Sequence, residues 1–329
     1  MSIEQITDPK NFRFTLKPLD PKYEGVWELY KVQQRAYWIA EEIKYSNADV
    51  EHFNSLKPEE QQCIKMVLAF FASGDGIVNS NLRERFLIEF TPPEIQVTYS
   101  YQMMIENIHS EVYSDLIQNI IKDPDERTKL FNSIETIESV KKMSQWAINW
   151  IKSDTSIGQR IIAFSIFEGV FFSGMFALIF WVKKMRGDGL FLEAIIKSNR
   201  LISRDEGIHV LFACELYKHI INKVDQKTVH EMFKEANEIS AEFMRDAIKC
   251  QMIGMNNELM NQYINYISDR LLVLLGYDKL YNTTNPFSFI DTISLHSKDN
   301  GFETRITEYQ SAHNKDNQHD WDFEILEKF

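Results

Sequence analysis

The chain has 329 residues, of which 44% are hydrophobic and 13% are aromatic, with only 12 glycines and 8 prolines. This length allows one large domain with a deep core, and the scarcity of helix-breaking residues favours an all-α class. A formal net charge of −12 leaves no basic stripe to neutralise phosphates, which argues against nucleic acid as a partner.

Cysteine usage and the N-terminal stretch indicate the compartment. Cys63, Cys214 and Cys250 are odd in number and widely spaced, and no two of them form a Cys-x-x-Cys pair. Such a set is typical of reduced core thiols in a cytosolic protein. The first dozen residues have neither a basic segment nor an apolar segment, so we expect no secretory signal and a cytoplasmic location.

The first third of the chain predicts an irregular start followed by two helices. Three prolines fall within residues 1–24, which we expect to be irregular. A helix over about 25–45 would carry Trp38. Pro58 suits the first position of the next helix, which we expect to run to roughly Phe90, because proline needs no hydrogen bond from its nitrogen there.

Two proline-containing stretches predict helix starts in the middle of the chain. Thr91-Pro-Pro-Glu94 resembles a capping box with proline in the first helical positions. Asp123-Pro-Asp-Glu126 restarts the chain in the same way. Shorter helices are predicted over about 125–135 and 138–152.

A long apolar stretch has two interpretations. Ile161–Val182 is 22 residues long and contains a single charge, Glu168. By hydropathy it qualifies as a membrane span. The alternative, which we favour, is a helix that is apolar all round because it lies in the centre of a large bundle. An acid inside the stretch needs a reason, and a metal site within the bundle gives one. Gly187-Asp-Gly189 then ends this helix.

The last third of the chain changes character. Helices are predicted over about 226–252 and 256–275, and beyond Tyr277 the helical periodicity fades. We therefore divide the chain into three parts, which are an irregular N-terminal segment (1–24), a helical bundle (25–276) and a C-terminal extension with a flexible docking tail (277–329).

Two Glu-x-x-His pairs indicate a site within the bundle. On a helix, residues three apart point the same way, so each pair presents a carboxylate and an imidazole to one place. One such pair is weak evidence, because any amphipathic helix can hold it. Here each pair follows a lone acid in an apolar helix. The candidate ligands are Asp75, Glu106, His109, Glu168, Glu206 and His209.

The spacing and chemistry of these residues favour a pair of metal ions. The acid precedes its pair by 31 residues in the first set and by 38 in the second, about one helical hairpin each. This order matches the known pattern of ferritin-like di-metal carboxylate bundles. Four buried carboxylates would repel one another without cations. Oxygen and imidazole ligands without thiolate suit iron or manganese better than structural zinc.

Tyr113 and an aromatic stripe stand beside this pattern. Tyr113 follows His109 by one helical turn, so its ring should lie near the metals. A core tyrosine with a bonded hydroxyl is the ordinary alternative, but next to a site that activates oxygen it becomes an oxidisable group. Phe172 and Phe176 follow Glu168 on roughly the same face. They would serve equally as plain core or as a shield around a tyrosyl radical.

These motifs resemble the small, radical-generating subunit of class I ribonucleotide reductase, of the eukaryotic and large-DNA-virus type. The resemblance covers nearly the whole chain from Tyr37 onward. Its most specific pieces are Phe70–Asn79, Glu106–Tyr113, Glu168–Gly174 and Ile202–His209. It implies that a di-iron site activates O2 and generates a stable tyrosyl radical. The radical would then pass to a large catalytic subunit that reduces ribonucleotides to deoxyribonucleotides.

The resemblance also implies a role for individual residues. It implies two iron ions per chain at the six candidate ligands, with manganese as the alternative, and Tyr113 as the radical. The apolar cage of the radical would be Phe172, Phe176 and Ile202. The radical-transfer relay would be Trp38, Asp205 and His109, with Tyr309 passing the radical onward. The family also implies a homodimer.

The C-terminal tail is the predicted docking element. Residues 313–320 are polar enough to be an unpacked linker, and 321–329 end in large apolar side chains. Phe323 and Phe329 keep the family's terminal phenylalanines and would bind the large subunit. Lys328 stands where the family has an acid, so we expect a shifted docking groove in the cognate large subunit.

Two other classes of protein would share part of this pattern. A ferritin-like oxidase or iron-handling protein would have the same ligands without long-range radical transfer, but Tyr113 and the tail speak against it. A non-catalytic partner subunit would be signalled by a lost ligand, and none is lost. Gly74 stands where the family usually has serine, a change that we expect to be tolerated.

Overall fold

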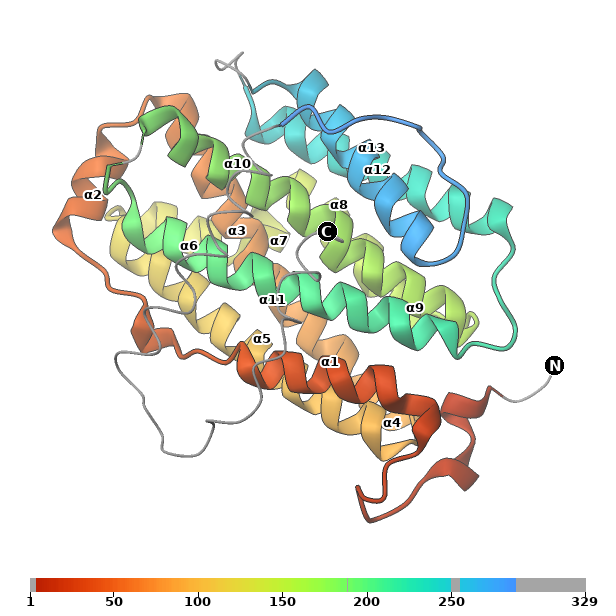
Figure 1. Ribbon diagram of the computed structural model, residues 1–329. Coiled ribbons are helices and arrows are strands. Elements are labelled where there is room, and N and C mark those ends of the chain that lie inside the picture. Colours follow the sequence, from red (N-terminus) through yellow and green to blue (C-terminus); the bar gives the residue numbers. More distant parts are fainter. Residues whose placement is uncertain (1–3, 188, 250–254, 288–329) are drawn as a thin grey trace.

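The computed structural model describes residues 4–187, 189–249 and 255–287, and this part of the chain is helical (Figure 1). The longer helices are α1 (Glu24–Arg35), α3 (Pro58–Asn81), α5 (Pro93–Ile120), α8 (Glu138–Lys152), α9 (Ile157–Ile166), α10 (Phe172–Arg186), α11 (Glu193–Lys218), α12 (Gln226–Ala247) and α13 (Asn257–Leu274). The shorter ones are α2 (Asn47–Asn54), α4 (Leu87–Glu89), α6 (Pro124–Phe131) and α7 (Ser133–Thr136). The predicted all-α class is confirmed.

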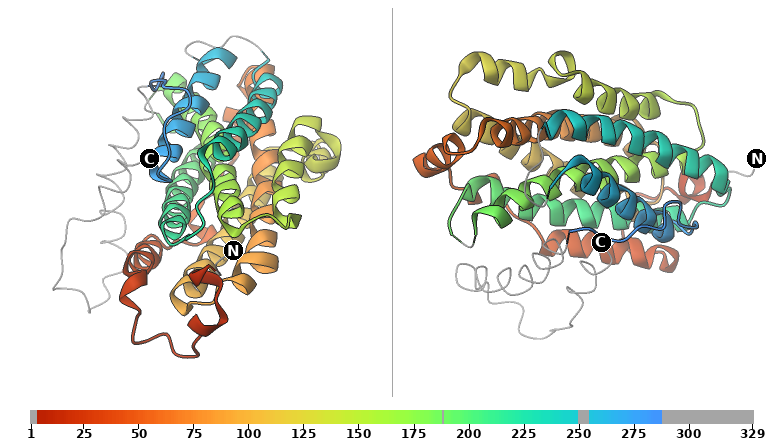
Figure 2. Two further views of the ribbon diagram at one scale, coloured as in Figure 1. Left: turned by 90° about the vertical axis from the view of Figure 1, so that its right-hand side faces the viewer. Right: turned by 90° about the horizontal axis from the view of Figure 1, so that it is seen from above.

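The long helices pack side by side in a bundle. α3 packs against α5, α10 packs against α11, and α1 lies across both α5 and α11. α12 pairs with α13, while α8 covers α3 and α12 on the side of the bundle away from α1 (Figure 2). The middle of α3, α5 and α11 and the junction of α9 with α10 therefore face a common interior.

The apolar stretch forms one continuous helical run from Ile157 to Arg186. It is long and apolar enough to cross a membrane, but 94% of its most apolar window is buried inside the protein. This burial favours the central-helix interpretation, because a membrane span would present its apolar side chains to lipid. Gly187 follows with a φ of 80°, a conformation that glycine adopts at little cost, and the helix ends there.

Two short π-helices interrupt the long helices near the interior. One of them, Leu82–Phe86 (η5), continues α3, and the other, Phe167–Phe171 (η6), joins α9 to α10. A π-helical turn is wider than an α-helical one, and such turns occur frequently at functional sites. The second contains Glu168, so the lone acid of the apolar run sits on a widened turn.

The predicted helix over 25–45 was wrong in its second half. α1 ends at Arg35, and Trp38 lies in the link that follows. The backbone leaves the helix here because tertiary contacts hold it. Arg204 donates to the carbonyl of Ala36, and the Trp38 indole reaches Asp205. A short 3₁₀ turn (Ala40–Glu42) and the unpredicted helix α2 come next.

The predicted capping box at Thr91-Pro-Pro-Glu94 was also wrong. α5 begins at Pro93, and its start has no side-chain cap. Thr91 donates to the carbonyl of Asp8, while the buried Glu94 accepts from the backbone of Asp20 and from Arg13. Both side chains therefore tie the N-terminal segment to the bundle and do not close the helix.

Two helix starts agree with the structure, whereas the predicted end of α12 does not. Asp123 caps α6 by accepting from the backbone of Glu126 at 2.8 Å, and Pro58 opens α3. α12 ends at Ala247, five residues before the predicted end. Tyr309 and the docking tail lie outside the described residues, and the three-part division of the chain stays a prediction.

Candidate metal centre

The six predicted ligands come from four helical elements and meet in the interior. α3 contributes one carboxylate, η6 another, and α5 and α11 each contribute a Glu-x-x-His pair. Each of the six is at most 2% exposed. They are Asp75, Glu106, His109, Glu168, Glu206 and His209. The structure brings all six together, as their spacing predicted, while their role as ligands stays a prediction.

The donor atoms form two groups that share Glu106. In each group, one donor atom per residue lies within 4.8 Å of the others. The groups are Asp75 with Glu106 and His109, and Glu106 with Glu168, Glu206 and His209. The pairs also cross, because His109 Nδ1 lies 3.0 Å from Glu206 Oε1 and His209 Nδ1 lies 3.0 Å from Glu106 Oε1. Two overlapping groups are the arrangement that a pair of ions with a shared carboxylate requires.

Unpartnered polar atoms show that the residues fit such ions. Within the described part of the chain, three buried carboxylate oxygens of the cluster have neither a hydrogen-bond partner nor an ion-pair contact. They are both oxygens of Asp75 and Oε2 of Glu168. Buried polar atoms are normally bonded. Oxygen and imidazole donors that converge in this way suit hard or intermediate cations such as iron and manganese.

The electrostatics of the cluster also favour added cations. Burial raises the pKa of Asp75 and of Glu168, and neighbouring carboxylates raise both further. Burial also acts to raise the pKa of Glu106, but His109 and His209 outweigh it and hold that pKa at about 2. For both histidines burial lowers the pKa, and the adjacent carboxylates outweigh it. Without metal, protons on Asp75, Glu168 and the two histidines therefore offset the negative charge of the cluster. Bound metal ions would replace those protons.

Sequence reasoning missed a neighbour of Glu168. Gln102 lies on α5 one turn before Glu106, and its Nε2 donates to Glu168 Oε1 at 2.8 Å. The side chain is fully buried. The sequence offered one indication of this contact. Gln102 precedes Glu106 by four residues, which places both side chains on the same face of the helix.

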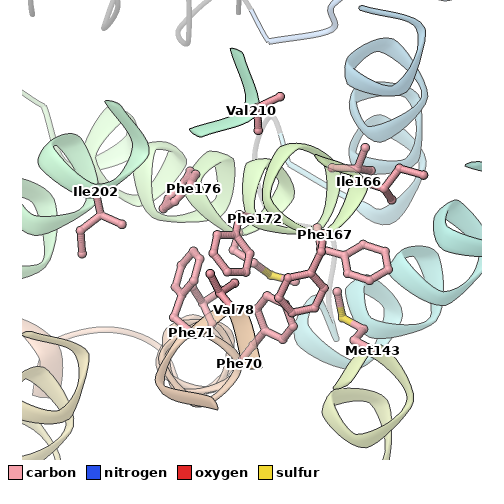
Figure 3. Close-up of a cluster of buried hydrophobic side chains, with 14 of the residues drawn as sticks. Phe70, Phe71, Val78, Met143, Ile166, Phe167, Phe172, Phe176, Ile202 and Val210 are labelled. Atoms are coloured by element: carbon pink, nitrogen blue, oxygen red, sulfur yellow. The ribbon is translucent and has the colours of Figure 1, made fainter. Parts of the chain in front are cut away.

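Phe71, Phe172 and Phe176 belong to a buried aromatic cluster (Figure 3), and Tyr113 packs against this cluster. The ring that stacks on Tyr113 is Phe71, with centroids 4.6 Å apart and an angle of 10° between the planes. Phe172 and Phe176 pack against Phe71 in turn, with centroids at 5.2 and 4.9 Å. Sequence reasoning missed Phe71, which lies one turn before Asp75 on α3. Ile202, the third predicted cage residue, is fully buried.

The Tyr113 hydroxyl is buried and neutral. Its side chain is 2% exposed, and the hydroxyl has no partner among the residues that the structure describes. Burial raises its pKa well above the ordinary value, and the negative charges of the nearby carboxylates add to this effect. The phenol therefore keeps its proton in the absence of an oxidant.

A hydrogen-bonded chain runs outward from His109. Nε2 of His109 lies 3.2 Å from Asp205 Oδ2, and the Trp38 indole donates to the same oxygen at 2.6 Å. The rings of Trp38 and His109 are 6.0 Å apart. Burial acts to raise the pKa of Asp205, but Arg204 and His109 outweigh it and hold that pKa at about 2. The ionised carboxylate of Asp205 thus connects Trp38 with His109, so the three predicted relay residues are in contact.

Comparison with known proteins identifies the family. A family model described as "Ribonucleotide reductase, small chain" matches residues 13–286. The chain belongs to this family. The predicted assignment to an oxidoreductase small subunit is therefore confirmed.

Individual members of the ribonucleotide reductase small-chain family are similar over most of their length. "Ribonucleoside-diphosphate reductase subunit M2" of Danio rerio is 50% identical over 91% of this chain and 76% of its own length. The "Ribonucleoside-diphosphate reductase small chain" of Vaccinia virus (strain Ankara) is 46% identical over 94% of both. The solved Rnr4 homodimer from Saccharomyces cerevisiae has a TM-score of 0.76 at 31% identity, over 93% of this chain and 92% of its own. The predicted ferritin-like bundle is confirmed.

Proposed function

We propose that this chain generates a stable tyrosyl radical at Tyr113 and delivers it to a large catalytic subunit for the reduction of ribonucleotides. The observation that carries the proposal is the convergence of six buried ligand candidates beside a buried tyrosine, with a hydrogen-bonded path leading away from them. The family supports the reaction, because the relatives are named ribonucleoside-diphosphate reductase.

The six candidate ligands would hold two metal ions per chain. The donor set supports iron, with manganese as the alternative, because it offers carboxylate oxygens and imidazole nitrogens without thiolate. When bound, the metal pair supplies the activation of O2 and so the oxidising power. The residues supply the geometry. Glu106 belongs to both donor groups and suits a position between the ions.

Tyr113 would lose one electron and its hydroxyl proton. Its hydroxyl is protonated before oxidation, because burial and nearby carboxylates raise its pKa. Phe71 covers one face of the ring, and Phe172 and Phe176 extend the apolar wall behind it. Such a wall keeps water and reductants away from the oxidised ring, which supports a long lifetime for the radical.

Trp38, Asp205 and His109 would carry the electron between the metal centre and the surface. Asp205 holds the indole N–H and the imidazole through one carboxylate oxygen, so the two rings keep a fixed relation. Tyr309 would continue the path toward the large subunit. The tail would dock there through Phe323 and Phe329. We also propose a homodimer in the cytoplasm, and the homodimeric structure of the yeast relative supports the dimer.

Replacement of Tyr113 by phenylalanine tests the proposal. Tyr113→Phe keeps the ring but loses the oxidisable hydroxyl, so the variant should bind metal and consume oxygen yet support no ribonucleotide reduction with its large subunit. Tyr99→Phe is the matched control. Tyr99 is also on α5, is 1% exposed where Tyr113 is 2% exposed, and also has an unpartnered hydroxyl in the described part of the chain. Its variant should stay active. Full activity of Tyr113→Phe would place the radical elsewhere, with Tyr101 or Tyr217 to test next.

A further inference from the structure

The hydrogen bond between Gln102 and Glu168 links two ligand-bearing elements. Gln102 Nε2 donates to Glu168 Oε1 at 2.8 Å, and both side chains are at most 1% exposed. With a metal ion bound, Glu168 would be ionised, and a bond from a neutral donor to an ionised carboxylate is stronger than one between neutral groups. The reverse orientation of the amide would place two acceptor oxygens together, so the carboxylate determines which way the amide points.

The side-chain amide of Gln102 has no second hydrogen-bond partner among the described residues. Gln102 Oε1 is buried and unpartnered among the described residues. The hydroxyl of Tyr99, one turn earlier on α5, is also unpartnered there. The hydrogen bond to Glu168 is therefore the interaction that fixes the Gln102 side chain.

Glu168 lies on a widened helical turn and has one partnered and one unpartnered carboxylate oxygen in the part of the chain that the structure describes. It lies in the π-helix Phe167–Phe171, where the turn is wider than in the flanking α-helices. Its Oε1 is taken by Gln102, and its Oε2 is buried and unpartnered within the described part. Glu168 also contributes one donor atom to the group with Glu106, Glu206 and His209. The amide therefore leaves one carboxylate oxygen free for that group.

We propose that Gln102 is a positioning residue that restricts Glu168 to one-oxygen binding of a metal ion. The inference rests on the proposed metal function and deepens it. Asp75, the equivalent acid of the other group, has both oxygens unpartnered in the described structure, so no amide restricts it. Asp75 could then offer both carboxylate oxygens to its ion, whereas Glu168 would offer only one.

The chemistry of glutamine suits this role. A carboxylate at this position would add a further acid to the buried cluster and repel Glu168. An apolar side chain would leave Oε1 without a donor and let the carboxylate rotate on its widened turn. Hydrogen-bond partners of metal ligands orient those ligands, and their loss typically costs about 10–100-fold in metal affinity.

A manganese titration of the full chain tests the proposal. Gln102→Met removes the amide but keeps an unbranched side chain of similar length. Thr98→Val is the matched control, because Thr98 is fully buried one turn earlier on α5 and loses only its bond to the carbonyl of Glu94. Metal-free proteins would be titrated with Mn(II) without oxygen, and free Mn(II) would be followed by electron paramagnetic resonance (EPR).

The wild type and Thr98→Val should each bind two ions with the same pair of affinities. Gln102→Met should bind one ion normally and the other about 10–100-fold more weakly. Gln102→Leu gives the same test if the methionine variant does not fold. The inference would be overturned if Gln102→Met bound both ions with wild-type affinity, or if Thr98→Val lost as much affinity as Gln102→Met. Either result would leave the proposed function standing. A wild-type chain that binds no ion pair would overturn the proposed function as well.

Discussion

The candidate metal centre has two halves that share one sequence pattern but have different surroundings. The first half is Asp75 with Glu106 and His109, and the second half is Glu168 with Glu206 and His209. In the first half, the acid Asp75 has no hydrogen-bond partner in the described structure, and His109 continues through Asp205 to Trp38 near the surface link. In the second half, the acid Glu168 is held by Gln102 and lies within the most apolar helical run of the chain. A repeated ligand motif therefore does not make two equivalent sites.

The difference follows from the elements that pack on each half. α1 lies across α5 and α11 next to the first half, and the link after α1 brings Trp38 to Asp205. Tyr113 follows His109 on the same helix. The second half is flanked by α9, α10 and α13, which supply apolar side chains. If the proposed function holds, the first half would exchange electrons with the surface, and the second half would hold a ligand in dry surroundings.

The largest loss of activity is expected on replacement of Trp38, which connects the first half of the site with the link after α1. Trp38→Phe removes the indole donor to Asp205 and replaces an oxidisable ring with one that is much harder to oxidise. Ribonucleotide reduction with the large subunit should be almost abolished, while metal uptake stays at the wild-type level. Trp146→Phe is the control, because Trp146 is also buried but its indole donates to Glu235 on α12, away from the path. Activity that survives in Trp38→Phe would show that the radical takes another route.

Removal of the acid from each half tests whether the halves bind separate ions. Glu168→Ala should bind substantially less metal than the expected pair, and Asp75→Ala should lose the ion of the other half. Metal content per chain, measured after loading and desalting, checks both. Two ions retained in Glu168→Ala would show that Glu168 is not a ligand.

Metal removal should lower the thermal stability of the whole bundle. The ligands come from four helical elements, so ions that bind only the folded state stabilise it by linkage, roughly 2.7 kcal/mol per site at a free metal concentration of 100 times Kd. Scanning calorimetry of metal-free and metal-loaded protein measures the difference. Equal melting temperatures would mean that the six side chains do not bind metal in the folded state.

The smallest effect is expected at Gly74, where α3 meets the aromatic cluster. A Cβ at this position would lie 3.2–3.3 Å from the Phe172 ring. Gly74→Ser must therefore move the ring by a few tenths of an ångström, at a cost of about 1–3 kcal/mol for overpacking. We expect a lower melting temperature, unchanged metal content and a small change in the environment of Tyr113. An unchanged melting temperature would show that Phe172 yields freely.

The sequence predicted the parts of this arrangement that depend on local spacing. The all-α class and the common face of each Glu-x-x-His pair follow from helical periodicity, which places residues three or four apart on one face. The convergence of these pairs with Asp75 and Glu168 followed from the match to the known pattern of ferritin-like bundles. The apolar stretch around Glu168 was ambiguous, because a central helix and a membrane span have the same composition. Its burial within the bundle resolved that ambiguity.

The features that sequence reasoning missed depend on partners far away in the chain. Phe71 stacks on Tyr113 from another helix, and Gln102 bonds to an acid 66 residues later. α1 ends at Arg35 without glycine or proline, because Arg204 and Asp205 draw the following link inward. Such contacts are set by packing and leave no local signal.

EPR at low temperature, after ferrous iron and oxygen are added to metal-free protein, tests the central claim most directly. With two ions bound per chain, the account predicts a stable tyrosyl signal that is absent from Tyr113→Phe and present in Tyr99→Phe. A chain that binds two ions, consumes oxygen and gives no tyrosyl signal would contradict it.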